Sequence, residues 1–94
     1  MDDWQNKLDA ERKGINQIDS KILELLNARG VHAAEIGRIK KNIGKDVNDP
    51  SREKELFARL NKMNSELGGA VDDEAVKSIF EAIIVQMKRI QIRD

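Results

Sequence analysis

Cysteine is absent from this chain of 94 residues, and histidine occurs only once, as His32. Without cysteine the chain forms neither a disulfide framework nor a thiolate metal site. One histidine does not make a convincing zinc site, because such sites take about three or four protein ligands. The sequence therefore predicts no metal site.

An excess of charge of one sign is also absent, since 17 basic and 17 acidic residues cancel. This balance removes the usual electrostatic argument for a nucleic-acid or membrane surface, so any basic site must be local. The first residues, MDDWQNKLDAERKG, are too polar for a signal peptide. No apolar run approaches the roughly 20 residues of a membrane span. We expect a cytoplasmic protein that binds neither nucleic acid nor membrane.

Proline occurs once, at Pro50, so none interrupts the first half of the chain. Apolar residues there recur at steps of three, four and seven, which fits a helix and no strand. This spacing predicts one long helix from about Gln5 to Lys41. Glycines inside it cost about 1 kcal/mol each relative to alanine, and they could let another helix approach closely. The apolar positions are Leu8, Ile15, Ile18, Ile22, Leu25, Leu26, Ile36 and Ile39, and the glycines are Gly14, Gly30 and Gly37.

The segment Lys41–Asn48 loses this period and is predicted to be a loop. Asp49 then supplies an N-cap and Pro50 a first helical position, so a second helix is expected to start here. It runs to Leu67, before a pair of glycines that begins at Gly68.

A third helix is expected to open at Val71–Asp73. Its apolar stripe is Val76, Ile79, Phe80, Ile83, Ile84, Met87 and Ile90. The chain is therefore predicted to be all-α, with one very long helix and two shorter ones in a single domain, residues 1–94.

The length of the first helix bears on assembly. A helix from Gln5 to Lys41 would span roughly 55 Å, whereas a compact chain of this size is about 30 Å across. Its overhanging apolar positions need a partner, unless the helix kinks at a glycine. We expect a homodimer, since two-fold pairing is the commonest closed assembly.

Five polar residues stand at positions that should face inward: Arg12, Arg29, Lys40, Glu53 and Gln91. Taken singly, cations on amphipathic helices usually lie with the charge in solvent. Arg29 and Lys40 are close to three full turns apart, so they share a face and could bracket a small anion. Arg12 lies about 100° around the helix from Arg29 and about 25 Å along it. It would therefore join such a site from the other protomer.

The combination of motifs is more specific than its parts. It includes I-D-x-x-I-L-x-L-L-x-x-R ending at Arg29, E-I-G-x-x-K ending at Lys40, and D-P-x-R-E from Asp49 to Glu53. With Gln91 after the third helix's stripe, the chain resembles chorismate mutases of the all-helical AroQ class. The resemblance covers about residues 8–91.

The resemblance implies an intertwined homodimer of three-helix protomers, in which each active site takes one arginine from the partner. It implies the [3,3] rearrangement of chorismate to prephenate, on the route to phenylalanine and tyrosine. That reaction needs no nucleophile, metal or cofactor. It is accelerated by holding the dianionic substrate in its compact conformer and by stabilising the charge that develops as the ether bond breaks.

The resemblance also implies individual roles. Arg12 from one protomer and Arg29 from the other would bind the two substrate carboxylates, where the guanidinium fork allows bidentate pairing. Lys40 and Gln91 would donate to the ether oxygen, which gains negative charge in the transition state.

The remaining roles belong to the second and third helices. Glu53 would accept from the ring hydroxyl, helped by the backbone at Asp49, with Arg52 holding that region in place. Met87 stands near the expected substrate, where many relatives have a small or hydroxylic residue.

Two alternatives stay open at this point. An isochorismate pyruvate lyase would share the fold and the cationic lining, but the lyases that resemble this family have no carboxylate at the place of Glu53. A regulatory, weakly active mutase-like dimer could instead work in a complex with another shikimate-pathway enzyme.

Overall fold

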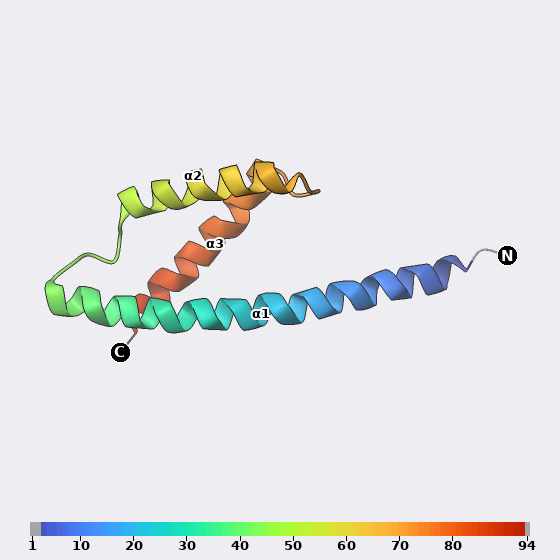
Figure 1. The fold of residues 1–94 in the computed structure, drawn as a ribbon. Helices are drawn as coiled ribbons and strands as arrows, with labels where there is room; N and C mark the ends of the chain where they lie inside the picture. Colours follow the sequence, from blue (N-terminus) through green and yellow to red (C-terminus); the bar gives the residue numbers. More distant parts are fainter. Residues whose placement is uncertain (1–2, 94) are drawn as a thin grey trace. The chain divides into compact units, whose positions relative to one another are not determined.

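The computed structural model describes residues 3–93 and contains three helices, α1 (Trp4–Ile43), α2 (Pro50–Leu67) and α3 (Asp73–Ile92) (Figure 1). No strand occurs among these residues, so the all-α prediction is confirmed. The bounds of α2 are those predicted, while α1 extends slightly beyond the predicted helix at both ends. Within the described residues, none of the helices is long and apolar enough to cross a membrane.

The chain divides into two compact units, Met1–Val31 and His32–Asp94. The described part of the first unit is almost entirely helical and belongs to α1. The second unit contains the last turns of α1 together with α2 and α3.

Helix α1 ends where glycine permits a left-handed turn. Gly44 follows the last helical residue and has a φ of 71°, a conformation that costs glycine little. The backbone N–H of Lys45 then donates to the carbonyl of Lys40 at 2.8 Å. This bond satisfies a carbonyl of the last helical turn, as in a Schellman motif, and it turns the chain into the loop that leads to α2.

The ends of α2 follow the predicted signals. The Asp49 side chain caps the helix by accepting from the backbone N–H of Arg52 at 3.2 Å, and Pro50 occupies the first turn. At the other end Gly68 has a φ of 59°, and its N–H donates to the carbonyl of Asn64 at 3.1 Å. Both caps satisfy backbone groups that a helix end would otherwise leave without a partner.

Helix α3 has its own N-cap. The Asp72 side chain accepts from the backbone N–H of Ala75 at 2.8 Å. Asp73 and Glu74 add negative charge to the first turn, which the helix dipole favours.

The core of the unit His32–Asp94 is small: α2 and α3 pack against each other, and Ala33 of α1 adds to the buried residues. Removing each aliphatic side chain from water contributes about 1.5–3 kcal/mol. Three of the predicted α3 stripe residues are buried, whereas Ile79 and the α2 residues Met63 and Leu67 are exposed in the single chain. The buried apolar residues of the unit are Ala33, Leu56, Val76, Ile84 and Met87.

The unit Met1–Val31 carries a row of exposed apolar side chains along its helix. Their exposed fractions run from 43% for Leu8 to 69% for Leu25. Soluble monomers rarely expose apolar patches of this extent, and such patches commonly mark an interaction surface. The row consists of Leu8, Ile15, Ile18, Ile22 and Leu25.

Candidate active site

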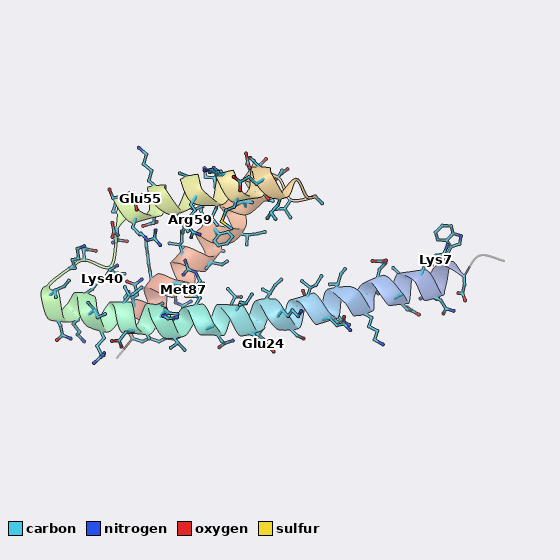
Figure 2. All side chains as sticks on the ribbon, viewed as in Figure 1. Lys7, Glu24, Lys40, Glu55, Arg59 and Met87 are labelled. Atoms are coloured by element: carbon cyan, nitrogen blue, oxygen red, sulfur yellow. The ribbon has the colours of Figure 1, made fainter. Side chains whose placement is uncertain are left out.

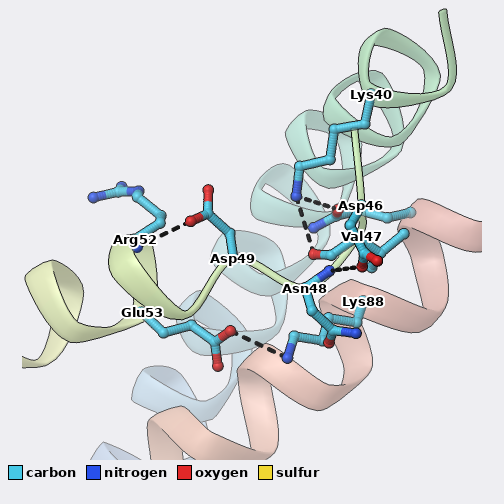
Figure 3. Close-up of polar contacts among 9 residues, drawn as sticks. Lys40, Asp46, Val47, Asn48, Asp49, Arg52, Glu53 and Lys88 are labelled. Atoms are coloured by element: carbon cyan, nitrogen blue, oxygen red, sulfur yellow. Dashed lines mark hydrogen bonds and ion pairs between the residues drawn. The ribbon is translucent and has the colours of Figure 1, made fainter. Parts of the chain in front are cut away.

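Lys40 lies at the meeting point of three segments in the unit His32–Asp94. Its ammonium Nζ donates to the side-chain Oε1 of Gln91 on α3 at 3.0 Å, and to the carbonyl of Val47 in the α1–α2 loop at 3.1 Å (Figure 3). Lys40 and Gln91 are both half-buried. The sequence assigned both residues to one site from different helices, and the structure brings them into direct contact.

The contact between Lys40 and Gln91 leaves N–H groups of both side chains available to a ligand. Because an ammonium group only donates, the contact fixes the oxygen of the Gln91 amide toward Lys40 and leaves the amide nitrogen to donate elsewhere. The Lys40 ammonium has three N–H groups, and two are engaged. Both acceptors are uncharged, so these contacts do not cancel the positive charge. The pair can therefore donate to an electron-rich oxygen of a ligand.

Close packing of α1 against α3 places Gln91. A Cβ atom on Gly37 would lie 2.2 Å from the backbone oxygen of Gln91 and 2.6 Å from its Cα. Such distances are far inside van der Waals contact, so only glycine permits this approach. The expectation that a glycine lets another helix approach closely is confirmed at Gly37, one turn before Lys40.

Glu53 makes the second polar contact between helices of this unit. Its Oε2 lies 3.2 Å from the ammonium Nζ of Lys88 on α3, and Figure 3 shows the two side chains directed toward each other. Glu53 is half-buried, as its spacing from the apolar face of α2 predicted.

Lys88 is the contact residue that the sequence reasoning did not identify. The signal was present, since Lys88 follows the stripe residue Ile84 by four positions and precedes Gln91 by three. Residues three apart are neighbours on a helix surface. Helix α3 therefore presents the Gln91 contact and the Glu53 contact on adjacent turns.

The loop between α1 and α2 is held by short polar contacts. Asp46 Oδ1 accepts from the backbone N–H of Asn48 at 2.8 Å, next to the Val47 carbonyl that receives Lys40. Asp49 fixes the junction with α2 through its cap. Arg52 contributes its backbone N–H to this cap, while its side chain is exposed and extends away from Glu53 in Figure 3.

The other predicted site residues differ in their surroundings. Met87, labelled on α3 in Figure 2, is only 6% exposed and belongs to the core. Arg12 and Arg29 belong to the unit Met1–Val31, where Arg12 is exposed and Arg29 is half-buried. The structure thus joins Lys40 to Gln91 and Glu53 to Lys88, and it describes the two arginines only within their own unit.

The unit His32–Asp94 therefore offers hydrogen-bond donors from α1 and α3, and a carboxylate from α2. Such an arrangement can bind an oxygen-rich anion that also carries a hydroxyl group. Fixed charges and dipoles placed in this way can stabilise a transition state in which negative charge develops.

Sequence comparison identifies the family. The family model described as chorismate mutase type II matches residues 11–92. The chorismate mutase of Methanocaldococcus jannaschii is 38% identical over 85 residues, which cover 90% of this chain and 84% of that protein. A bifunctional chorismate mutase/prephenate dehydratase of Aquifex aeolicus is 40% identical over 74 residues, 78% of this chain and 20% of the larger protein.

Solved structures indicate the same family. Form II of the chorismate mutase from Thermus thermophilus superposes with a TM-score of 0.87 at 32% identity, covering 94% of this chain and 97% of that one. Form I superposes with a TM-score of 0.79 at 33% identity, covering 86% and 98%. The chain therefore belongs to the chorismate mutase type II family.

Proposed function

We propose that residues 1–94 form one chorismate mutase domain, which converts chorismate to prephenate by a [3,3] rearrangement. The observation that carries the proposal is the Lys40–Gln91 contact at 3.0 Å, which joins two donors 51 positions apart in the chain. The reaction breaks the ether C–O bond and forms a C–C bond within one molecule. No atom enters or leaves, so the protein has to supply only shape and electrostatics.

Lys40 and Gln91 act on the ether oxygen in this proposal. That oxygen gains negative charge as its bond to the ring breaks. The free N–H groups of the ammonium and the amide donate to it, and these bonds strengthen as the charge grows. Interactions that are stronger in the transition state than in the ground state raise kcat. The close approach at Gly37 supports this role, because it fixes the backbone of Gln91 beside α1.

Glu53 accepts a hydrogen bond from the ring hydroxyl, beside the backbone of Asp49, and Met87 lies near the bound substrate. The support for Glu53 is its half-buried position toward α3. Arg52 acts through the backbone of the first turn of α2, where its N–H holds the Asp49 cap.

Arg12 and Arg29 bind the substrate carboxylates, with Arg12 supplied by the partner protomer of a homodimer. The exposed apolar row of the unit Met1–Val31 supports the dimer, because a second chain would remove it from water. Bidentate guanidinium–carboxylate pairs would hold the substrate in its folded conformer.

The setting of the reaction is part of the proposal. The Aquifex aeolicus relative carries chorismate mutase and prephenate dehydratase in its name, as does a relative from Neisseria gonorrhoeae, which is 36% identical over 78% of this chain and 19% of that protein. This chain spans about a fifth of each. We place the activity in the cytoplasm, where an enzyme that consumes prephenate would act next.

The direct test supplies the purified protein with chorismate and, separately, with isochorismate. We expect chorismate to disappear and prephenate to form in equal amount, with no pyruvate released from either compound. Release of pyruvate from isochorismate without prephenate formation from chorismate would replace the proposal with a lyase. Turnover of neither compound above the uncatalysed rate would leave a non-catalytic binding dimer.

A further inference from the structure

Lys88 differs from Lys77, the other lysine of α3, in what it contacts. Its ammonium lies 3.2 Å from Glu53 on another helix, and the two side chains are only 28% and 31% exposed. Lys77, on the same helix, lies 4.0 Å from Glu81 one turn away, with side chains 70% and 55% exposed. Exposed ion pairs such as Lys77–Glu81 contribute little to the stability of the fold. The Lys88–Glu53 pair instead links α2 to α3 where solvent screens it less.

The charges of the site explain why such a pair is needed. Chorismate carries two carboxylates, and the proposed hydroxyl acceptor Glu53 is itself a carboxylate. An uncompensated Glu53 would repel the substrate. Lys40 does not compensate it, because the ammonium of Lys40 donates to the uncharged oxygens of Gln91 and Val47. Lys88 neutralises Glu53 locally and leaves the charge of Lys40 to the substrate.

The contact also orients the carboxylate. Lys88 engages Oε2 of Glu53, and Oε1 can accept from a hydroxyl without competing with this contact. Lys88 precedes Gln91 by three positions and is therefore its neighbour on the surface of α3. One helix thus carries both the amide that faces the ether oxygen and the cation that holds the hydroxyl acceptor.

We propose that Lys88 is a positioning residue, which orients Glu53 and cancels its charge so that a dianionic substrate can bind beside it. This inference rests on the proposed function, because it assigns Glu53 to the ring hydroxyl of chorismate. Lys88 acts through Glu53 and makes no required contact with the substrate.

The test is a double-mutant cycle on kcat and KM for chorismate. We expect Lys88→Met to lower kcat/KM about tenfold when Glu53 is present, and to have little effect in a Glu53→Gln background, where no charge needs compensation. Lys88→Arg should restore most of the activity. Lys77→Met is the matched control, since it removes the same charge from the same helix, and it should leave kcat/KM unchanged.

A second measurement separates charge from folding. In Lys88→Met the KM should rise less steeply with KCl than it does in the unmodified protein, because salt then screens the repulsion between Glu53 and the substrate as well as the attraction of the cations. Lys88→Gln, which keeps a polar side chain, serves if the methionine variant does not fold by circular dichroism.

Three results would overturn the inference. An equal loss in both backgrounds would mean that Lys88 binds substrate directly or only supports the fold. An unchanged kcat/KM in folded Lys88→Met or Lys88→Gln would show that Lys88 has no role in substrate binding or catalysis. Absence of prephenate formation by the unmodified protein would remove the proposed function and this inference together, whereas an active protein with additive losses would contradict the inference alone.

Discussion

The cationic side chains of the unit His32–Asp94 differ in the groups that they contact. The ammonium of Lys40 donates to two uncharged oxygens, whereas Lys88 and Arg38 each meet a carboxylate. Burying part of a charge costs free energy that a counter-ion normally offsets. A half-buried cation held by neutral acceptors is therefore suited to receive an anionic ligand, and Lys40 is the residue on which the proposed chemistry depends.

Arg38, two positions before Lys40, forms an ion pair within its own helix. Its guanidinium makes two hydrogen bonds to Glu35, which lower the pKa of that carboxyl below its ordinary value. A carboxyl whose pKa is lower in the folded chain stabilises the fold above its unfolded-state pKa. This stabilisation is lost as pH falls through the folded-state pKa.

Glu35→Gln should therefore lower the free energy of unfolding slightly at neutral pH, and the difference from the unmodified protein should vanish in acid. Urea unfolding at a series of pH values, at fixed protein concentration, measures this. The pair is exposed, so the difference should be small and should shrink further in high salt. A difference that stays constant through the acid range would show that the carboxylate charge is not its cause.

The sequence located Glu53 but not its partner. Glu53 stands three, four and seven positions before apolar residues of α2, so helical periodicity alone directs it inward. Lys88 also stands on an apolar stripe, but long basic side chains there usually reach solvent. Only the packing of α2 against α3 decides that this lysine meets a carboxylate, and no local rule contains that information.

The crossing of α1 and α3 is set by the absence of a side chain at Gly37. The backbone of Gln91 occupies the space that a Cβ would take. Helix propensity disfavours glycine by about 1 kcal/mol relative to alanine, so its presence in the last turns of α1 has a cost. In return, the glycine permits the close approach of the two helices, which brings the amide of Gln91 to Lys40.

Gly37→Ala should therefore destabilise the protein, although alanine is the better helix former. Overpacking a tight contact costs typically about 1–3 kcal/mol, and here the obstructing atoms are backbone, which no rotamer change can remove. We also expect a lower kcat, because Gln91 must move away from Lys40. Urea unfolding at one fixed protein concentration, with steady-state kinetics, checks both effects.

Gly69→Ala provides the comparison, because no atom lies within 4 Å of its added Cβ and its φ is not positive. It should leave both stability and kcat nearly unchanged. If Gly37→Ala were as stable and as active as Gly69→Ala, the helix crossing would not depend on the glycine.

The ends of the helices were predictable, whereas their crossing was only partly so. Asp49, Pro50 and Gly68 act on the residues next to them, so their positions in the sequence are sufficient to place the bounds of α2. Gly37 was recognised as a small residue that another helix could approach. Its partner, Gln91, lies in another helix, and periodicity does not pair the two.

For the molecule as a whole, the exposed apolar row of the unit Met1–Val31 raises the question of assembly. Helix length alone predicted that these positions need a partner, and in the single chain they are exposed. A homodimer that shares its sites would use the row as an interface and would bring Arg12 to the site of the other protomer. The sequence cannot supply the register of such a pairing, since it depends on both chains at once.

Mixing Arg12→Ala protein with Lys40→Met protein tests the sharing of sites. Each variant alone should be nearly inactive. In a heterodimer one site receives both changes and the other receives neither. Random exchange makes half the dimers mixed, so about a quarter of the unmodified activity should return. Failure to recover activity after subunit exchange has been verified, for example by mass spectrometry of tagged chains, would contradict shared sites.

The kcat of Lys40→Met on chorismate tests the role of the Lys40–Gln91 contact most directly. Removing one donor from a developing negative charge typically costs about 100- to 1000-fold in kcat, so we predict a loss of that size with a much smaller change in KM. Lys62→Met, an exposed lysine of α2, is the matched control and should keep its full rate. A Lys40→Met protein that is folded and retains a kcat within about twofold of the unmodified enzyme would contradict the mechanism, since such a donor should contribute far more.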